Sequence, residues 1–327
     1  MADCSRFLRN RRDILLKIVF MGTPEFAACS LRALIDAGYD IPLVITQPDR
    51  RGNRNKMILS AVKQVAMENG LEVAQPVRIR KDEELKERLR SIAPDMIVVD
   101  AFGQILPRDV LDIPRLGCIN VHGSLLPDLR GAAPMQAAIL NGLDESGVTI
   151  MKMEEGLDTG DMISKVVCDI RGKDITEVSE ILAKAGAELL VETIPHIADG
   201  TAVYEKQDDS LSSYAKMINK TDGMTDFNEP AEVIERKIRA YLEWPACYSY
   251  LDGLQVKFYR AEALADGPDG EPGTVSETGK NYYVINCSEG RLKVLEQQLQ
   301  GKKRMSAGDF MRGHKLSRGD RFTAQNV

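Results

Sequence analysis

Several features that would place a protein in a particular class are missing from this 327-residue chain. No stretch approaches the ~20 apolar residues that a membrane-spanning helix needs, so we expect no membrane partner. The six cysteines are scattered without a CxxC pair. This is typical of free thiols in a reducing compartment and predicts a cytoplasmic protein. Only three histidines occur, far apart in the sequence, so we expect no metal site.

A glycine-rich dinucleotide motif is missing as well. The chain begins its first strand-like run with KIVFM, followed by a Gly-Thr-Pro turn and a helical pattern. The turn GTPEF lacks the GxGxxG spacing that lets the backbone approach a pyrophosphate. A dinucleotide-dependent dehydrogenase is therefore disfavoured, and failure to bind NAD or NADP would exclude it.

Positive charge is scarce overall, since the formal net charge is −6. This argues against a general nucleic-acid-binding protein. Residues 291–321 differ, because nine Lys or Arg there outnumber three acidic residues and leave a local charge of +6. A basic end on an acidic protein predicts a docking site for a polyanion. A solvated lysine-rich surface would explain this segment equally well if it stood alone.

The pattern of apolar runs predicts two domains. Residues 1–16 precede the first strand and are expected to be an N-terminal extension. Apolar strands alternate with helices over 17–204, which predicts an α/β catalytic domain with a Rossmann-like, doubly wound, mostly parallel sheet. Residues 205–215 are polar and predict a linker. Short strands between Gly, Asp and Pro turns over 216–327 predict a smaller C-terminal β-barrel.

The most unusual stretch is GCINVHGSLLPDLRGAAP at residues 117–134. Asn120, His122 and Ser124 alternate, so they share one face of an extended segment. They lie where a predicted strand ends, which is where parallel sheets bind ligands. A buried polar pair satisfied by backbone groups is the structural alternative. A second stretch, GLDTGD at residues 156–161, supplies Asp158 from a glycine-bounded loop.

Together, an amide, an imidazole and a carboxylate predict an acyl-type transfer without a covalent enzyme intermediate. Amide and imidazolium N–H groups stabilise an oxyanion, and a carboxylate orients the imidazole and assists proton transfer. A serine nucleophile is not predicted, because Ser124 has no second histidine beside it in the motif.

INVHGSLLPDLRGAAP and GLDTGD, in this order and about this far apart, resemble the signature of the folate-dependent formyltransferases. KIVFMGTPEFA, TQPDR and the C-terminal GKKRMSAGDFMRG resemble the members of that family that act on methionyl-tRNA. The resemblance extends from about Lys17 to Phe322. It implies an oligonucleotide-binding (OB-like) barrel that contacts tRNA as the second domain.

The resemblance implies that the chain transfers a formyl group from 10-formyltetrahydrofolate, a cosubstrate, to the α-amino group of methionine on initiator methionyl-tRNA, for translation initiation. The amine would attack the formyl carbon directly. Asn120 and a protonated His122 are expected to donate hydrogen bonds to the oxyanion of the tetrahedral intermediate. Asp158 is expected to orient His122 and to help move a proton through water.

The resemblance also implies binding residues. Folate is expected to contact two loops, namely Ser124, Leu125, Leu126 and Pro127, and Phe102, Gly103, Gln104 and Ile105. The tRNA is expected to contact cations in two segments, namely Arg50, Arg51, Arg54 and Lys56, and Lys302, Lys303 and Arg304. Arg130 either contacts substrate or braces its turn. Asp100 departs from the small or apolar residue usual in the family, and faces either a helix end or the folate pocket.

Other functions stay open at this point. A formyltransferase acting on another amine, such as a sugar nucleotide or glycinamide ribonucleotide, would share the Asn-His-Asp set. The basic C-terminal segment favours tRNA over these acceptors. A non-catalytic RNA-binding protein is disfavoured because Asn120, His122 and Asp158 are all present. We expect a monomer.

Overall fold

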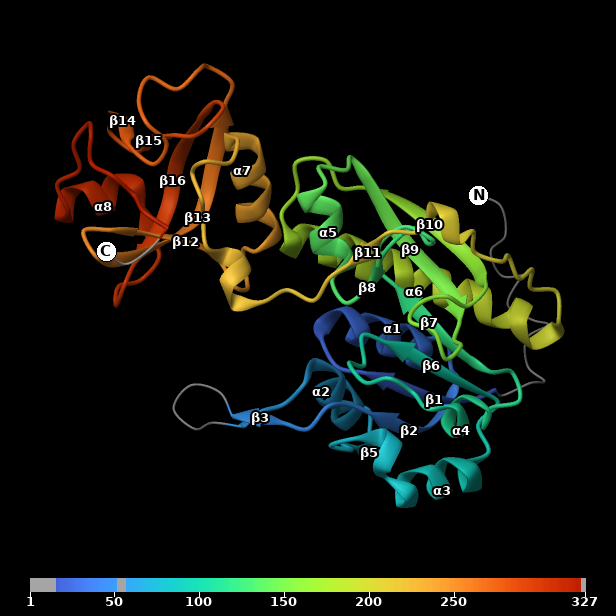
Figure 1. The fold of residues 1–327 in the computed structure, drawn as a ribbon. Coiled ribbons are helices and arrows are strands. Elements are labelled where there is room, and N and C mark those ends of the chain that lie inside the picture. Colours follow the sequence, from blue (N-terminus) through green and yellow to red (C-terminus); the bar gives the residue numbers. More distant parts are fainter. Residues whose placement is uncertain (1–15, 52–56, 325–327) are drawn as a thin grey trace, which may run out of the picture. The chain divides into compact units, whose positions relative to one another are not determined.

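The computed structural model describes residues 16–51 and 57–324, which form two compact units (Figure 1). The first unit comprises Met1–Arg130, Gly147–Cys168 and Glu180–Tyr214. The second comprises Gly131–Ser146, Asp169–Ser179 and Ala215–Val327. The predicted N-terminal extension, apart from Leu16, lies outside the described residues, as do Arg54 and Lys56.

A seven-stranded sheet of order β10-β9-β7-β6-β1-β2-β5 forms the framework of the first unit. Neighbouring strands from β7 to β5 are parallel, whereas β9 pairs with β7 in the antiparallel direction. The strands are β1 (Lys17–Gly22), β2 (Asp40–Ile45), β5 (Val73–Ala74), β6 (Met96–Asp100), β7 (Cys118–His122), β9 (Glu145–Lys152) and β10 (Met162–Asp169).

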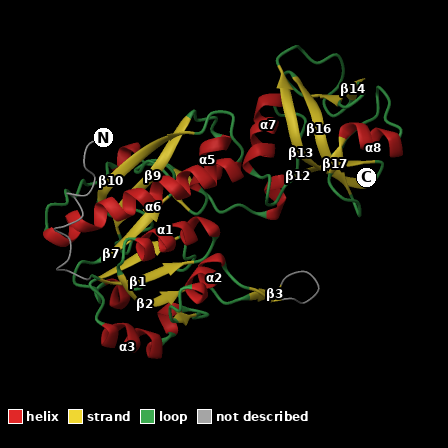
Figure 2. Cartoon of the chain, turned by 180° about the vertical axis from the view of Figure 1, so that it is seen from behind, coloured by secondary structure: helices red, strands yellow, loops and turns green. Residues whose placement is uncertain are grey.

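Helices cover both faces of this sheet, which explains why its central strands are apolar on both sides. Helices α1 (Glu25–Asp36), α2 (Ala61–Glu68) and α6 (Ile175–Asp199) lie on one face (Figure 2). On the other face, alternate residues of β1, β2 and β6 form one buried cluster with α3 (Glu83–Ile92) and α4 (Arg108–Leu111). Ser60 and Asp82 cap α2 and α3, each accepting a backbone N–H three residues later.

Short elements connect these layers. The polar segment 205–215, predicted as a linker, carries a 3₁₀ turn and a short strand. The remaining elements before residue 216 are β3 (Arg50–Arg51), β4 (Met57–Ile58), β8 (Arg130–Gly131), β11 (Tyr214–Ala215), α5 (Pro134–Leu140), η2 (Ile79–Lys81) and η3 (Asp209–Leu211).

The main part of the second unit is an antiparallel sheet of order β12-β13-β16-β15-β14, with β17 paired to β16. Residues near its C-terminus join the two edges, because Thr323 exchanges backbone hydrogen bonds with Tyr250 of β12 and Phe322 donates to Gly273 beside β14. The elements are η4 (Lys220–Gly223), α7 (Ala231–Ala240), β12 (Cys247–Leu251), β13 (Leu254–Leu264), β14 (Val275–Thr278), β15 (Tyr283–Asn286), β16 (Arg291–Leu299), β17 (Met305–Ser306) and α8 (Ala307–Gly313).

An aromatic core fills this closed sheet. Phe322 packs against Phe227, Phe258 and Tyr283, with ring centroids 5.8 to 6.2 Å apart. The predicted fold class, a Rossmann-like α/β sheet followed by a smaller β domain, is confirmed. No helix in the described ranges is long and apolar enough to cross a bilayer.

Candidate functional site

Strand β7 carries two of the three predicted catalytic residues. Its Asn120 lies beside Val99 of β6 and Met151 of β9, and its side chain is half-buried. His122 ends the strand and is 5% exposed. Because residues two apart on a strand point the same way, the amide and the imidazole share the face that also carries α3 and α4.

The hydrogen bonds of His122 define what each ring nitrogen can do. Nε2 lies 3.0 Å from the carbonyl oxygen of Leu129. A carbonyl only accepts, so Nε2 carries a proton and donates it there. Nδ1 lies 3.8 Å from Oδ2 of Asp158, which is too long for a direct hydrogen bond but spans an ion pair with a protonated ring. Nδ1 is therefore a donor only when the imidazole is cationic.

Both partners of His122 have left-handed backbone conformations. Leu129 has φ 58° and Asp158 has φ 54°, values that L-residues with a Cβ adopt at a cost of about 1–2 kcal/mol. Strained residues of this kind persist only where the surrounding structure holds them, and they gather at functional sites. The structure thus brings His122 and Asp158 together, 36 positions apart in sequence, through two strained loops.

The first predicted folate loop is held by internal hydrogen bonds. The Ser124 hydroxyl donates to the Asp128 carbonyl at 2.7 Å, and the Ser124 carbonyl accepts from Thr149 Oγ1 at 2.7 Å. Thr149 Oγ1 also accepts the Leu126 N–H. Leu126 is buried against Met151 and Met162, whereas Leu125 and Pro127 are half-buried. Ser124 and Leu126 therefore shape the loop, and Leu125 and Pro127 offer apolar surface.

The second predicted folate loop follows β6. Phe102 is buried in the core of the first unit, and Gly103 is exposed with φ +81°. The Gln104 amide accepts from Ile79 N and donates to Pro76 O, so it braces the loop. Ile105, by contrast, is 77% exposed. Of these four residues, Ile105 offers an apolar side chain to a ligand.

The question about Asp100 is answered by its hydrogen bond. The carboxylate is fully buried and Oδ2 accepts a 2.6 Å hydrogen bond from Ser30 in α1. Burial raises the pKa of Asp100 to about 8, against a smaller lowering by Ser30. Asp100 thus faces a helix on the sheet face opposite to Asn120 and His122 and is not part of the candidate site.

A cysteine close to Asn120 is no nucleophile. Cys118 lies two residues earlier on β7 and its thiol is directed at the Leu111 carbonyl, 3.8 Å away. Burial raises the pKa of this thiol to about 12, so the thiolate is a minute fraction at neutral pH. Cys118 is therefore a buried thiol of the core of the first unit.

The predicted tRNA-binding cations fall in both units. Arg50 is exposed on β3, and β3 pairs with β4. Arg51 ends that strand, and its side chain is outside the described part. Lys302, Lys303 and Arg304 are exposed on the turn between β16 and β17. Arg304 pairs with Glu296 at 2.6 Å and lies over the Tyr259 ring.

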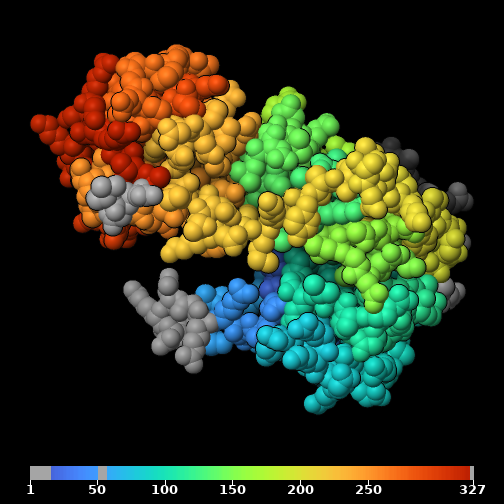
Figure 3. Space-filling model, in the orientation of Figure 1, coloured from blue at the N-terminus to red at the C-terminus, as the bar shows by residue number. Residues whose placement is uncertain are grey.

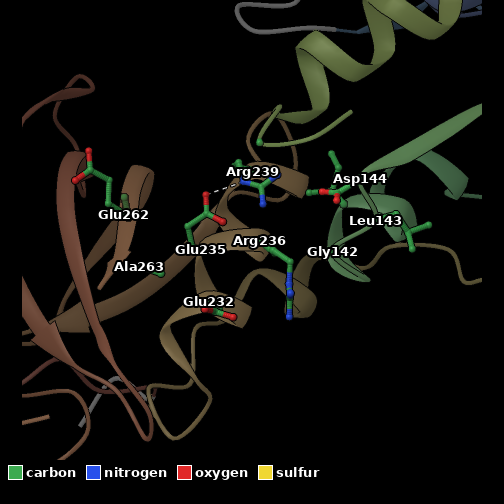
Figure 4. A pocket seen from close by; sticks show the side chains of 12 residues that line it. Gly142, Leu143, Asp144, Glu232, Glu235, Arg236, Arg239, Glu262 and Ala263 are labelled. Atoms are coloured by element: carbon green, nitrogen blue, oxygen red, sulfur yellow. Dashed lines mark hydrogen bonds and ion pairs between the residues drawn. The ribbon is translucent and has the colours of Figure 1, made fainter. Parts of the chain in front are cut away.

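Two further features bear on where chemistry occurs. A hollow of about 430 Å³ in the second unit is lined by Arg236, Arg239 and several acidic residues (Figure 4). None of the predicted catalytic or folate residues lines it. Within residues 16–51 and 57–324, no three His, Cys, Asp or Glu side chains are grouped to hold a metal ion.

Arg130 and Gln207 complete the surroundings of the site. Arg130 is almost fully buried and donates to Gln207 Oε1 at 2.9 Å and to Asp209 Oδ1 at 2.8 Å. Arg130 therefore braces its turn. Sequence reasoning missed Gln207, because a glutamine in a polar segment carries no signal of a structural role.

The chain matches two family models. Residues 16–194 match "Formyl transferase" and residues 217–315 match "Formyl transferase, C-terminal domain". The chain is 46% identical over 306 residues to the methionyl-tRNA formyltransferase of Citrifermentans bemidjiense, covering 93% of this chain and 95% of that protein. It is 45% identical over 308 residues to that of Clostridium acetobutylicum, covering 93% and 99%.

Among solved structures, the fold is similar to that of the N-formyltransferase from Helicobacter canadensis, solved in complex with folinic acid and dTDP-3-aminofucose. The TM-score is 0.66 at 20% identity, over 89% of this chain and 100% of that chain. At this identity, the similarity establishes the shared fold.

Proposed function

This chain belongs to the formyl transferase family, and we propose that it transfers a formyl group from 10-formyltetrahydrofolate to the α-amino group of methionine on initiator methionyl-tRNA. The curated relatives at 45–46% identity carry the name methionyl-tRNA formyltransferase and match over nearly their whole length. An amine on a sugar nucleotide fits less well, since the sugar-modifying neighbour is 20% identical.

The observation that carries the proposal is the pairing of His122 with Asp158 beside Asn120 at the end of β7. The donor set fits attack on a formyl carbonyl, because one amide N–H and one imidazolium N–H belong to neighbouring positions on the same strand face. His122 is buried and Asn120 is half-buried, and hydrogen bonds to a developing charge are stronger away from bulk water.

The amine nitrogen adds to the formyl carbon, and the carbonyl oxygen becomes an oxyanion. The Asn120 amide and the Nδ1–H of cationic His122 donate to this oxyanion, while Nε2–H stays bound to Leu129. The carboxylate of Asp158, 3.8 Å from Nδ1, orients the ring and accepts the proton leaving the amine through water. The carbon–N10 bond then breaks and N10 takes a proton, which leaves tetrahydrofolate and formylmethionyl-tRNA.

The exposure of the two loops separates the residues that contact folate from those that hold the loops in place. Ile105, Leu125 and Pro127 provide apolar contact for the folate, and Ser124, Leu126, Phe102, Gly103 and Gln104 hold the two loops that carry them. For the tRNA, we propose Arg50, Arg51, Arg54 and Lys56 in one segment and Lys302, Lys303 and Arg304 in the other. The domain limits at 17–204 and 216–327, a monomeric state, a metal-free reaction and a cytoplasmic location also belong to the proposal.

The test is formyl transfer from 10-formyltetrahydrofolate to methionyl-tRNA by the wild type and His122→Ala side by side. Wild-type activity should fall by about 10²–10³-fold in kcat in the variant, because an oxyanion donor is lost. An Asn120→Asp variant keeps the shape of the side chain without the N–H donor, and should lose kcat to a similar extent.

The outcomes separate an error in the acceptor from an error in the site. An inactive wild type that binds the folate would redirect the search to another amine, such as an aminosugar nucleotide. Full activity of His122→Ala would show that the assignment of the site is wrong even if the substrates are right.

A further inference from the structure

The loop that carries Asp158 is held at two of its carbonyl groups by one side chain. Gln207 Nε2 lies 2.8 Å from the carbonyl oxygen of Asp158 and 2.7 Å from that of Gly160. An amide –NH₂ has two protons, so it can donate to both oxygens at once. The two carbonyls converge on one point because the backbone reverses at Asp158, with φ 54°.

The other end of the Gln207 amide is equally fixed. Its Oε1 accepts from Nε of the buried Arg130 at 2.9 Å, so the orientation of the amide is determined by its partners. The segment around Gln207 is attached on both sides, with Glu205 paired to Met162 and the Ser213 carbonyl accepting from Arg130 N. Gln207 therefore contacts the loop from a segment that is itself hydrogen-bonded to neighbouring elements on both sides.

The loop itself has little freedom to compensate. At Gly160, a Cβ would lie 1.9 Å from the Lys152 carbonyl oxygen, so the backbone of Gly160 packs directly against that of β9. Without the –NH₂ group, two carbonyl oxygens would face each other with no donor between them. A turn of the backbone at Asp158 would relieve that repulsion and would move the carboxylate away from His122.

We propose that Gln207 is a positioning residue for formyl transfer, which holds Asp158 in its left-handed conformation beside His122. The inference rests on the proposed function, because it takes Asp158 to be part of the site. Gln207 acts through Asp158 and touches neither substrate.

The test compares Gln207→Ala and Gln207→Glu with the wild type under saturating methionyl-tRNA and 10-formyltetrahydrofolate. Gln207→Glu keeps the size and the partner for Arg130 but lacks both donors when ionised. Each variant should lower kcat by about 10–100-fold, as expected when a catalytic group is displaced by roughly 1 Å. KM for both substrates should stay within about 2-fold. Gln64→Glu is the matched control, since exposed Gln64 donates to a single carbonyl of Leu59.

A double-mutant cycle separates positioning from general damage. If Gln207 works through Asp158, Gln207→Ala should lower kcat no further in an Asp158→Asn background. The inference would be overturned if the kcat losses of the two single variants multiply in the double variant, or if kcat of both Gln207 variants stays within 2-fold of wild type. His122→Ala remains the separate test of the proposed function. A lowered thermal midpoint that accounts for the whole loss in both variants would also overturn the inference.

Discussion

The neighbours of His122 determine which of its ring nitrogens carries a proton. One ring nitrogen donates to Leu129 O at 3.0 Å, and this bond fixes the tautomer of the neutral ring as Nε2–H. Neutral His122 would therefore present a lone pair at Nδ1, which repels an oxyanion. Nδ1 can therefore donate to an oxyanion only in the cationic ring, in which it lies 3.8 Å from the carboxylate oxygen of Asp158.

At Asp100, a buried carboxyl links stability to pH. Its pKa is raised to about 8 in the folded chain, from an ordinary value of 3.8, because burial disfavours the charged form. The folded state therefore keeps a proton that the unfolded chain releases. The resulting stabilisation is complete below the unfolded pKa and is lost as pH rises through the folded pKa near 8.

We therefore expect an Asp100→Asn variant, which cannot ionise, to lose this part of the pH dependence. Relative to the variant, the free energy of unfolding of the wild type should fall between about pH 4 and pH 8, by at most about 6 kcal/mol. Denaturant unfolding of the first unit at several pH values, followed by circular dichroism, measures the difference. Parallel curves for the two proteins would contradict the assignment.

Helices α2 and α3 offer a matched pair of C-terminal ends. Exposed Ala93 ends α3 with φ 47°. Gly70 follows α2 with φ +68°, and a Cβ added at Gly70 would have no other atom within 4 Å. Ala93→Gly should stabilise the protein by about 1 kcal/mol, because glycine has no Cβ penalty in this conformation. Gly70→Ala should destabilise it by a similar amount.

Denaturation midpoints of the two variants, with unchanged m values, provide the measurement. Because nothing lies within 4 Å of a Cβ at position 70, a steric clash of the added methyl group cannot explain the effect there. A change of the same sign in both variants would show that backbone conformation is not the cause.

The elements most visible in the sequence are those with a strong apolar period. KIVFM and MIVVD predict buried strands because their side chains are apolar on both faces, and the structure has β1 and β6 there. The sequence does not reveal α8, whose segment AGDFMRG buries Phe310 but is too short for a helical period. Likewise, Gln207 acts through contacts with residues 47 to 77 positions away, which no local pattern encodes.

For the molecule as a whole, the distribution of charge matters more than the total. A net charge of −6 repels RNA at long range, so a local basic surface must supply the attraction. Lys302 and Lys303 are exposed on the turn between β16 and β17, while neighbouring Arg304 is already paired with Glu296. The two lysines are thus the better phosphate ligands on this turn.

We expect Lys302→Ala combined with Lys303→Ala to raise KM for methionyl-tRNA by about 3–10-fold at low salt and to leave kcat unchanged, because phosphate contacts position the tRNA without entering the chemistry. The slope of log KM against log salt should fall by up to about 2, one unit for each lost phosphate contact. Lys184→Ala, at an exposed position of α6, is the control for a surface lysine and should change neither quantity. If KM and its salt slope in the double variant match those of Lys184→Ala, tRNA phosphates do not contact this turn, and the attraction must come from other cations of residues 291–321.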